Sequence, residues 1–111
     1  MEHKADIPQG TLDLMVLQTL ASMGPQHGYA IATRLEQVSH GSIQLNMGTL
    51  YPALMRLEQR RLIRGKWAIT ENNRRARFYD ITAPGRKQLD RERTSWRRTA
   101  EMMSRLLDEE G

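Results

Sequence analysis

The amino-acid sequence predicts a mainly α-helical domain with one small β-hairpin and a long C-terminal helix. Before residue 60, apolar residues recur at helical spacing in three segments. Over residues 63–82 the period shortens to the alternation of β-strands, interrupted by a polar turn. From residue 83 onward helical spacing returns and continues almost to the end of the chain. Three helices, a hairpin and a final helix are therefore expected in that order.

Length and composition limit the chain to one structural unit. Its 111 residues, 39% of them hydrophobic, can form one core but not two. Without cysteine, neither disulfide bonds nor a thiolate zinc site can form. The first residues lack the apolar run of a signal peptide, and no apolar stretch is long enough to span a bilayer. We therefore expect a cytoplasmic protein with no membrane partner.

The first helix is expected over Thr11–Met23. Its apolar residues surround most of the helix instead of forming one stripe, so the helix needs contacts on two sides. Thr11 is expected to cap its start, because a threonine side chain there can accept a backbone N–H. Gly24 and Pro25 are expected to end it, since glycine suits a C-terminal cap and proline cannot continue a helix.

Two further helices are expected before the hairpin. The second spans residues 28–39, and the side chains expected to face the core are Tyr29, Ile31, Ala32, Leu35 and Val38. The third carries a buried stripe of Leu50, Leu54 and Leu57. Pro52 costs about 3 kcal/mol inside a helix but is tolerated in its first turn. The third helix is therefore expected to start near Gly48 rather than at Asn46.

A hairpin with a basic tip is expected next. The first strand, residues 63–70, places Ile63, Trp67 and Ile69 on one side. Residues 71–76 supply a polar turn longer than the tight two-residue kind, and residues 77–82 form the return strand. Of the three hairpin aromatics, Trp67, Phe78 and Tyr79, most are expected to be buried, because they alternate with polar residues.

The final helix is expected to begin after Thr82, with Pro84 in its first turn, and to run to about Asp108. About 25 residues at 1.5 Å each span roughly 38 Å, so this helix projects from a small domain. Its apolar residues form a coiled-coil-like seam that one copy cannot cover, and two chains pairing through this helix and the first would cover it. The seam residues are Leu89, Trp96, Ala100, Met103, Leu106 and Leu107.

This order of elements is that of a winged helix-turn-helix with a long C-terminal dimerisation helix. Residues 1–82 are expected to form the DNA-binding domain, with 1–9 as a tail, and residues 83–111 the dimerisation helix. The net charge of +4 only weakly indicates an anionic partner. Between residues 56 and 77, however, eight basic residues face two acidic ones, a local charge of +6. This distribution favours double-stranded DNA as the partner.

The start of the third helix has the residues that a recognition helix needs. Small and polar side chains there let backbone amides and hydroxyls reach phosphates and base edges, where the helix dipole favours anions. The expected contacts are amides from Gln44 and Asn46, close approach at Gly48, hydroxyls from Thr49 and Tyr51, and a phosphate contact from Arg56. For any one of these residues, simple capping or packing is an equally good explanation.

Four segments, GTLDLMVLQTL, HGYAIATRLE, GTLYPALMRLE and RRARFYDITAPGRKQL, resemble the PadR family of bacterial transcriptional regulators in order and spacing. The resemblance extends from Gly10 to Leu89, and the single C-terminal helix is similar to the compact branch of the family. It implies a homodimer that binds a dyad-symmetric operator and usually represses. Recognition contacts are then implied at Thr49 and Tyr51, and wing contacts at Arg74, Arg75 and Arg77. Arg61 stands where the family commonly has glycine, which leaves the usual left-handed helix end in question.

Trp96 is the candidate effector residue. If two C-terminal helices cross at a two-fold axis, Trp96 and its symmetry mate can leave a flat slot for a planar aromatic effector, as the resemblance also implies for some compact members. The simpler explanation is that Trp96 only fills the dimer seam.

Enzyme and metal chemistry are not indicated. His3, His27 and His40 lack metal-ligand spacing, and no catalytic motif or phosphate-binding loop is present, so neither a cofactor nor an enzyme is expected. The alternative functions are an RNA-binding or a protein-interaction winged helix without specific DNA binding. Competition between RNA and DNA duplexes would test the first, and absence of salt-sensitive DNA binding would support the second.

Overall fold

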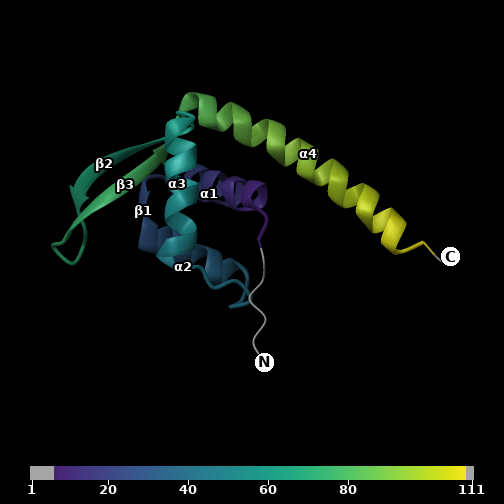
Figure 1. The fold of residues 1–111 in the computed structure, drawn as a ribbon, viewed down its shortest axis with the longest axis horizontal. Coiled ribbons are helices and arrows are strands. Elements are labelled where there is room, and N and C mark those ends of the chain that lie inside the picture. Colours follow the sequence, from purple (N-terminus) through teal and green to yellow (C-terminus); the bar gives the residue numbers. More distant parts are fainter. Residues whose placement is uncertain (1–6, 110–111) are drawn as a thin grey trace.

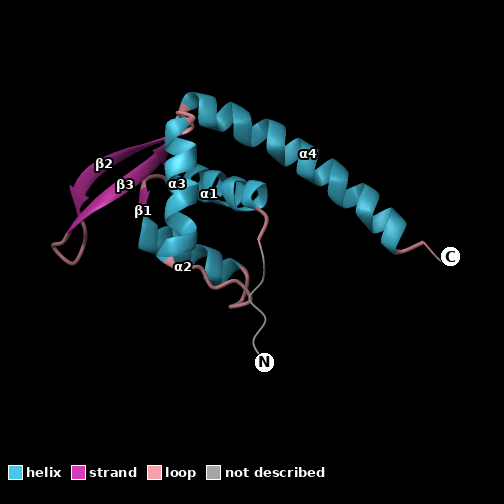
Figure 2. Cartoon of the chain, in the orientation of Figure 1, coloured by secondary structure: helices cyan, strands magenta, loops and turns pink. Residues whose placement is uncertain are grey.

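The computed structural model describes residues 7–109. This part of the chain contains four helices and a three-stranded antiparallel sheet (Figures 1 and 2), which confirms the mainly helical fold with a hairpin. In chain order the elements are α1 (Gln9–Met23), β1 (Gln26–His27), α2 (Gly28–Val38), α3 (Met47–Gln59), β2 (Ile63–Ile69), β3 (Arg75–Ile81) and α4 (Ala83–Leu107).

The core is built around α1. Val16, Leu17 and Leu20 are fully buried, and α1 packs against α2, α3, β3 and α4, so the expected contacts on two sides are confirmed. Its start was predicted wrongly: the helix begins at Gln9, after Pro8, and no side chain caps it. Gly24 ends α1 as expected, with a φ of 80° that suits glycine.

The short strand β1 was not predicted, because two residues carry no periodicity. It pairs with β3 through Gln26 opposite Tyr79 and His27 opposite Phe78, which gives the strand order β1-β3-β2. His27 also caps α2, since its Nδ1 accepts the Ala30 N–H at 3.3 Å.

The inward face of α2 is narrower than predicted. Ile31, Ala32 and Leu35 are buried, but Tyr29 and Val38 are exposed, so their expected burial was wrong. Tyr29 instead lines a cleft beside α3 and the wing, and Val38 lines a groove shared with α1 and α4.

The hairpin of β2 and β3 forms the wing. The strands pair from Ile63 opposite Ile81 to Ile69 opposite Arg75, so β3 begins two residues earlier than expected. A five-residue turn joins the strands, as the expectation of a longer loop required. Ile63 and Tyr79 are buried at the base of the wing, but Trp67 and Ile69 near its tip are exposed, because the sheet extends beyond the core there.

The helix α3 ends in a left-handed residue although that residue is not glycine. Arg61 has a φ of 62°, its N–H donates to the Glu58 carbonyl, and the Leu62 N–H donates to the Leu57 carbonyl. These two bonds form the Schellman motif that glycine usually terminates. The usual end of the helix is therefore present, with arginine in the strained position.

The helix α4 starts on the body and then projects away from it (Figure 1), giving the molecule a longest extent of 58 Å. Thr82 caps it as predicted, its Oγ1 accepting the Gly85 N–H at 3.0 Å. A Cβ on Gly85 would lie 2.1 Å from the Leu62 carbonyl oxygen, so only glycine allows this close approach. Leu89 is buried in the core of its own chain, so its predicted place in the dimer seam is wrong.

Candidate nucleic-acid interface

The start of α3 is held by Asn46 and presents polar side chains to solvent. The Asn46 Oδ1 accepts the Thr49 N–H at 2.9 Å, and regular helix begins at Met47, one residue before the expected start. The cap uses one acceptor position of this oxygen and leaves both N–H groups of the Asn46 amide free to donate to a base. Gly48 and Thr49 are exposed, as is Gln44 in the preceding connection.

Pro52 lies deeper in α3 than predicted, since it is the sixth residue of the helix and not in the first turn. A proline there cannot donate the N–H that would bond to the Gly48 carbonyl. Gly48 is exposed, so water can satisfy this carbonyl oxygen. The proline therefore leaves a hydrogen-bonding group uncommitted beside the polar start of the helix.

Tyr51 lies beside the base of the wing. Its side chain is half exposed, whereas Tyr79 on β3 is buried. Burial raises the pKa of Tyr79, and the neighbouring Tyr51 phenol raises it further. Tyr51 and Tyr79 line the same cleft between α3 and the wing.

Arg56 is turned away from the expected phosphate contact. Its Nη2 donates to the Asp13 Oδ1 at 2.8 Å, in an ion pair between α3 and α1, and its Nε is buried. Arg56 is thus engaged within its own chain, and its expected phosphate contact stays a prediction. The only acidic residue in α1 was the available signal, because a buried carboxylate needs a basic partner.

The three predicted wing arginines have different environments. Arg74 lies exposed in the turn, where its carbonyl accepts the Thr70 N–H at 2.7 Å. The Arg75 guanidinium lies over the Trp67 ring, 4.9 Å from its centroid. Arg77 instead donates to Glu58 of α3, and this hydrogen bond and charge raise the pKa of Arg77. Arg77 therefore bridges the wing and α3, and its expected contact with DNA stays a prediction.

Two further basic side chains, Arg64 and Lys66, are exposed on β2. They lie on the face of the hairpin opposite Trp67, because side chains alternate along a strand. Their alternation with apolar residues was visible in the sequence, but they were not assigned to the site. The wing therefore carries basic residues on both faces and at its turn.

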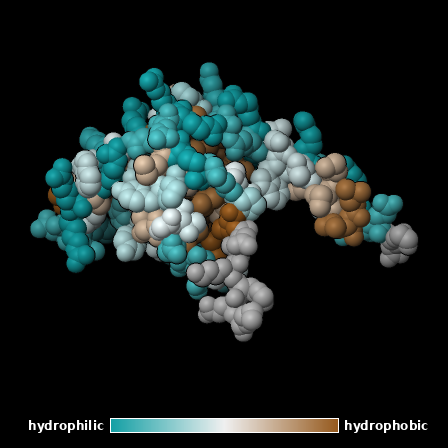
Figure 3. Space-filling model, in the orientation of Figure 1, coloured by the Kyte–Doolittle hydropathy of each residue, from teal (hydrophilic) through white to brown (hydrophobic). Residues whose placement is uncertain are grey.

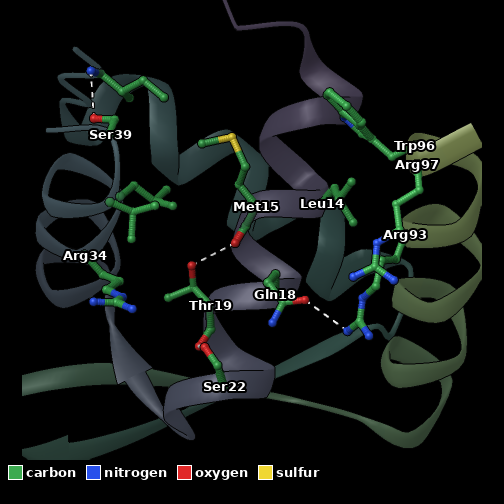
Figure 4. A pocket seen from close by; sticks show the side chains of 13 residues that line it. Leu14, Met15, Gln18, Thr19, Ser22, Arg34, Ser39, Arg93, Trp96 and Arg97 are labelled. Atoms are coloured by element: carbon green, nitrogen blue, oxygen red, sulfur yellow. Dashed lines mark hydrogen bonds between the residues drawn. The ribbon is translucent and has the colours of Figure 1, made fainter. Parts of the chain in front are cut away.

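A separate groove of about 730 Å³ lies between α1, α2 and α4. Figure 4 shows Leu14 of α1 on the side of Trp96 of α4, whereas Met15 of α1 points toward α2, and the Arg93 Nη2 donates to the Gln18 Oε1 at 3.0 Å. Trp96 is half exposed at the edge of this groove. The residue proposed for effector binding therefore does lie at a cavity, and the cavity is mainly apolar.

Comparisons with known proteins identify the family. The sequence profile of the "Transcriptional regulator PadR-like family" matches residues 16–91, which is more than half of the chain. The chain belongs to the PadR-like family. A PadR-like transcriptional regulator from Bacillus cereus is 27% identical and superposes with a TM-score of 0.80, over 92% of this chain and 96% of that one. A PadR family regulator from Eggerthella lenta is 29% identical with a TM-score of 0.75, over 92% and 86% of the two chains.

A curated relative supports the same match over a shorter region. An uncharacterized 37.1 kDa protein in a transposon of Streptomyces fradiae is 44% identical over 85 residues. These residues are 77% of this chain but 23% of the relative, so the chain spans about a quarter of that protein's length. The relative carries a PadR-like segment within a much longer chain.

The PadR-like family is a family of transcriptional regulators and not of enzymes. In residues 7–109, no group of three or more His, Asp or Glu side chains is placed to hold a metal ion. The helices of this same region are all too short or too polar to cross a membrane. His3, one of the three histidines whose spacing does not suit a metal site, lies outside the described residues.

Proposed function

We propose that this PadR-like protein is a homodimeric cytoplasmic regulator that binds a dyad-symmetric operator and represses transcription. The observation that carries the proposal is the polar start of α3 beside the basic wing. Thr49 and Tyr51 present hydroxyls there. Arg74 and Arg75 supply positive charge, and within residues 7–109 neither has an acidic side chain within 4.0 Å. In a winged helix, such a helix start reads base edges and the wing holds the DNA backbone.

The second copy is inferred from the projecting half of α4. Four seam residues, Trp96, Met103, Leu106 and Leu107, are between 42% and 74% exposed, and Met102 adds to them. Figure 3 shows the hydrophobic surface at this end of the molecule in brown. Apolar side chains gathered on a projecting helix are stabilised when another helix covers them. Ala100, between Trp96 and Met103, would allow two such helices to approach closely.

These surfaces assign DNA binding and dimerisation to different parts of the chain in our proposal. Residues 1–82 bind DNA and residues 83–111 dimerise, except that the first turns of α4 belong to the core of the DNA-binding part through Gly85 and Leu89. A two-fold dimer presents two copies of α3, so its operator would repeat each half-site with opposite orientation, about one helical turn apart.

Fluorescence anisotropy tests the proposal. A labelled duplex from upstream of the protein's own gene is compared with a scrambled duplex at several salt concentrations, with unlabelled duplex RNA as competitor. We expect tighter binding to the upstream duplex, two protomers per site and a steep salt dependence. Absence of salt-sensitive binding to any duplex would overturn the proposal in favour of a protein-interaction module. Preference for RNA would instead indicate an RNA-binding one.

A planar aromatic effector is proposed for the groove beside Trp96. Leu14, Met15 and Val38 supply apolar walls there, and Trp96 supplies a flat face for stacking. Titration of planar aromatic compounds should change Trp96 emission in a saturable way, measured as the signal that Trp96→Leu removes. A diverse panel that gives no such change leaves Trp96 as a residue of the dimer seam alone.

A further inference from the structure

The exposed tryptophan of the wing has no role in the core. Trp67 is 52% exposed, although it lies on the same face of the hairpin as the buried residues Ile63 and Tyr79. Ile69, two residues further along, is 62% exposed. An apolar ring of this size would stabilise the fold by a few kcal/mol if it were covered. Its exposure near the tip leaves the ring accessible to a partner.

The register of the hairpin places Trp67 among arginines. Trp67 pairs with Arg77, and Ile69 pairs with Arg75, so all four side chains share one face of the wing. Arg77 is bound to Glu58. Within residues 7–109, Arg75 has no acidic partner within 4.0 Å, and its guanidinium lies on the Trp67 ring instead. An indole in this position limits the directions that the guanidinium can take, without neutralising its charge.

The same tryptophan adjoins the start of the recognition helix. Trp67 lines a cleft of about 220 Å³ together with Tyr29 from α2 and Tyr51 from α3. A duplex whose base edges meet Thr49 and Tyr51 would therefore have its neighbouring backbone close to the Trp67 ring. That backbone offers an apolar sugar face and an anionic phosphate side by side, which matches a ring and a guanidinium side by side.

We propose that Trp67 and Arg75 form one DNA-contacting unit, in which the indole packs against a deoxyribose and holds the Arg75 guanidinium toward a phosphate. The proposal rests on the DNA-binding function and adds Trp67 to it as a contact and positioning residue. Because sugar and phosphate are the same at every step of the duplex, this contact contributes affinity without sequence preference.

A double-mutant cycle on duplex binding tests the unit. Affinity for a labelled random-sequence duplex at low salt is measured for Trp67→Leu, Arg75→Gln and the double variant. We expect Trp67→Leu to weaken binding about five-fold, the effect of losing one cation–π and packing contact. Arg75→Gln should lower the affinity by clearly less in the Trp67→Leu background than in the original chain, because without the indole the Arg75 guanidinium is no longer positioned. Trp67→Phe, which keeps a ring, should lose less affinity than Trp67→Leu.

Lys66→Gln is the matched control, because Lys66 lies on the opposite face of the same strand. The loss of affinity caused by Lys66→Gln should be the same with and without Trp67. Thermal melting curves for every variant distinguish a lost DNA contact from a loss of folding. If Trp67→Leu unfolds the wing, Trp67→Phe takes its place in the cycle, because it keeps an aromatic ring at this position.

Tryptophan fluorescence provides an independent test of the contact between Trp67 and DNA. Duplex should quench or shift the wild-type signal, and most of that change should disappear in Trp67→Phe. Unchanged affinity in Trp67→Leu, or an equal Arg75→Gln cost in both backgrounds, overturns the inference while the DNA-binding function stands. Failure of the unaltered chain to bind any duplex overturns the function itself.

Discussion

At the scale of single residues, three arginines are held by the fold itself. Arg61 holds a left-handed conformation, Arg56 is paired with Asp13, and Arg77 is paired with Glu58. Each has a structural role in a part of the chain whose composition suggested a continuous DNA-binding surface. Of the eight basic residues between 56 and 77, two are thus in ion pairs.

Replacing Arg61 by glycine is expected to stabilise the protein by about 0.5–1 kcal/mol. The left-handed backbone costs a residue with a Cβ about 1–2 kcal/mol, and the greater chain entropy of unfolded glycine offsets part of the gain. Urea unfolding at fixed protein concentration measures it. Arg60→Gly is the control, because Arg60 has a φ of −81° and has no such strain to relieve. Equal effects of the two changes would contradict the strain argument.

Replacing Arg56 by glutamine is expected to lower stability by about 3 kcal/mol, because it leaves the Asp13 carboxylate largely buried without its ion-pair partner. Asp13→Asn in the same chain should recover part of the loss, since it removes the uncompensated charge. The salt dependence of DNA binding should not change at temperatures where the variant is folded. A flatter salt dependence would instead place Arg56 at a phosphate.

At the scale of elements, α3 and the wing have separate tasks. The start of α3 carries amides and hydroxyls that can distinguish bases, whereas the wing carries charge. The Arg77 contact with Glu58 holds the two elements together, so both are expected to meet the duplex as one rigid surface.

Arg74→Gln is expected to weaken binding to all duplex sequences and to reduce the slope of log K against log salt by about 0.9, the value for one lost phosphate contact. Gln44→Ala should instead reduce the difference in affinity between the operator and a scrambled duplex and leave the salt slope unchanged. Anisotropy titrations across a salt series measure both quantities. These roles would be interchanged if Arg74→Gln altered sequence preference with no change in slope.

At the scale of the whole molecule, α4 joins the DNA-binding body to a projecting arm, the second half of α4, which carries the exposed apolar seam. Its first turns are locked to the body through Gly85 and Leu89, and its last turns carry exposed Leu106 and Leu107. Movement of α4 would therefore move the body with it, which links the spacing of two α3 helices in a dimer to the packing of the arms.

The double change Leu106→Asp and Leu107→Asp is expected to convert the proposed dimer into a folded monomer. Both side chains are more than half exposed, so their replacement should change the stability of the body by only about 0.5 kcal/mol. Loss of the second half-site contact should weaken operator binding about 100-fold or more. Analytical ultracentrifugation and anisotropy measure the two effects. Thr94→Asp, an exposed position on the opposite face of α4, is the control for added charge, and a dimer that survives the double change would exclude this seam.

The sequence by itself determined the local structure of this protein. Periodicity, capping residues and turn chemistry act within a few residues, so the spans of α2 and α4, the buried stripe of α3 and the hairpin were predictable, as was the winged-helix order. The polar start of α3 and the basic turn of the wing were likewise readable from residue types.

Only the tertiary structure decided what each face meets. Periodicity shows that Arg56 or Leu89 lies on a certain side of a helix, but not that Asp13 or the core lies opposite. It could not show that the wing extends past the core and leaves Trp67 exposed, or that two residues before α2 pair with β3. These outcomes depend on contacts between residues far apart in the chain, for which spacing along a single segment holds no information.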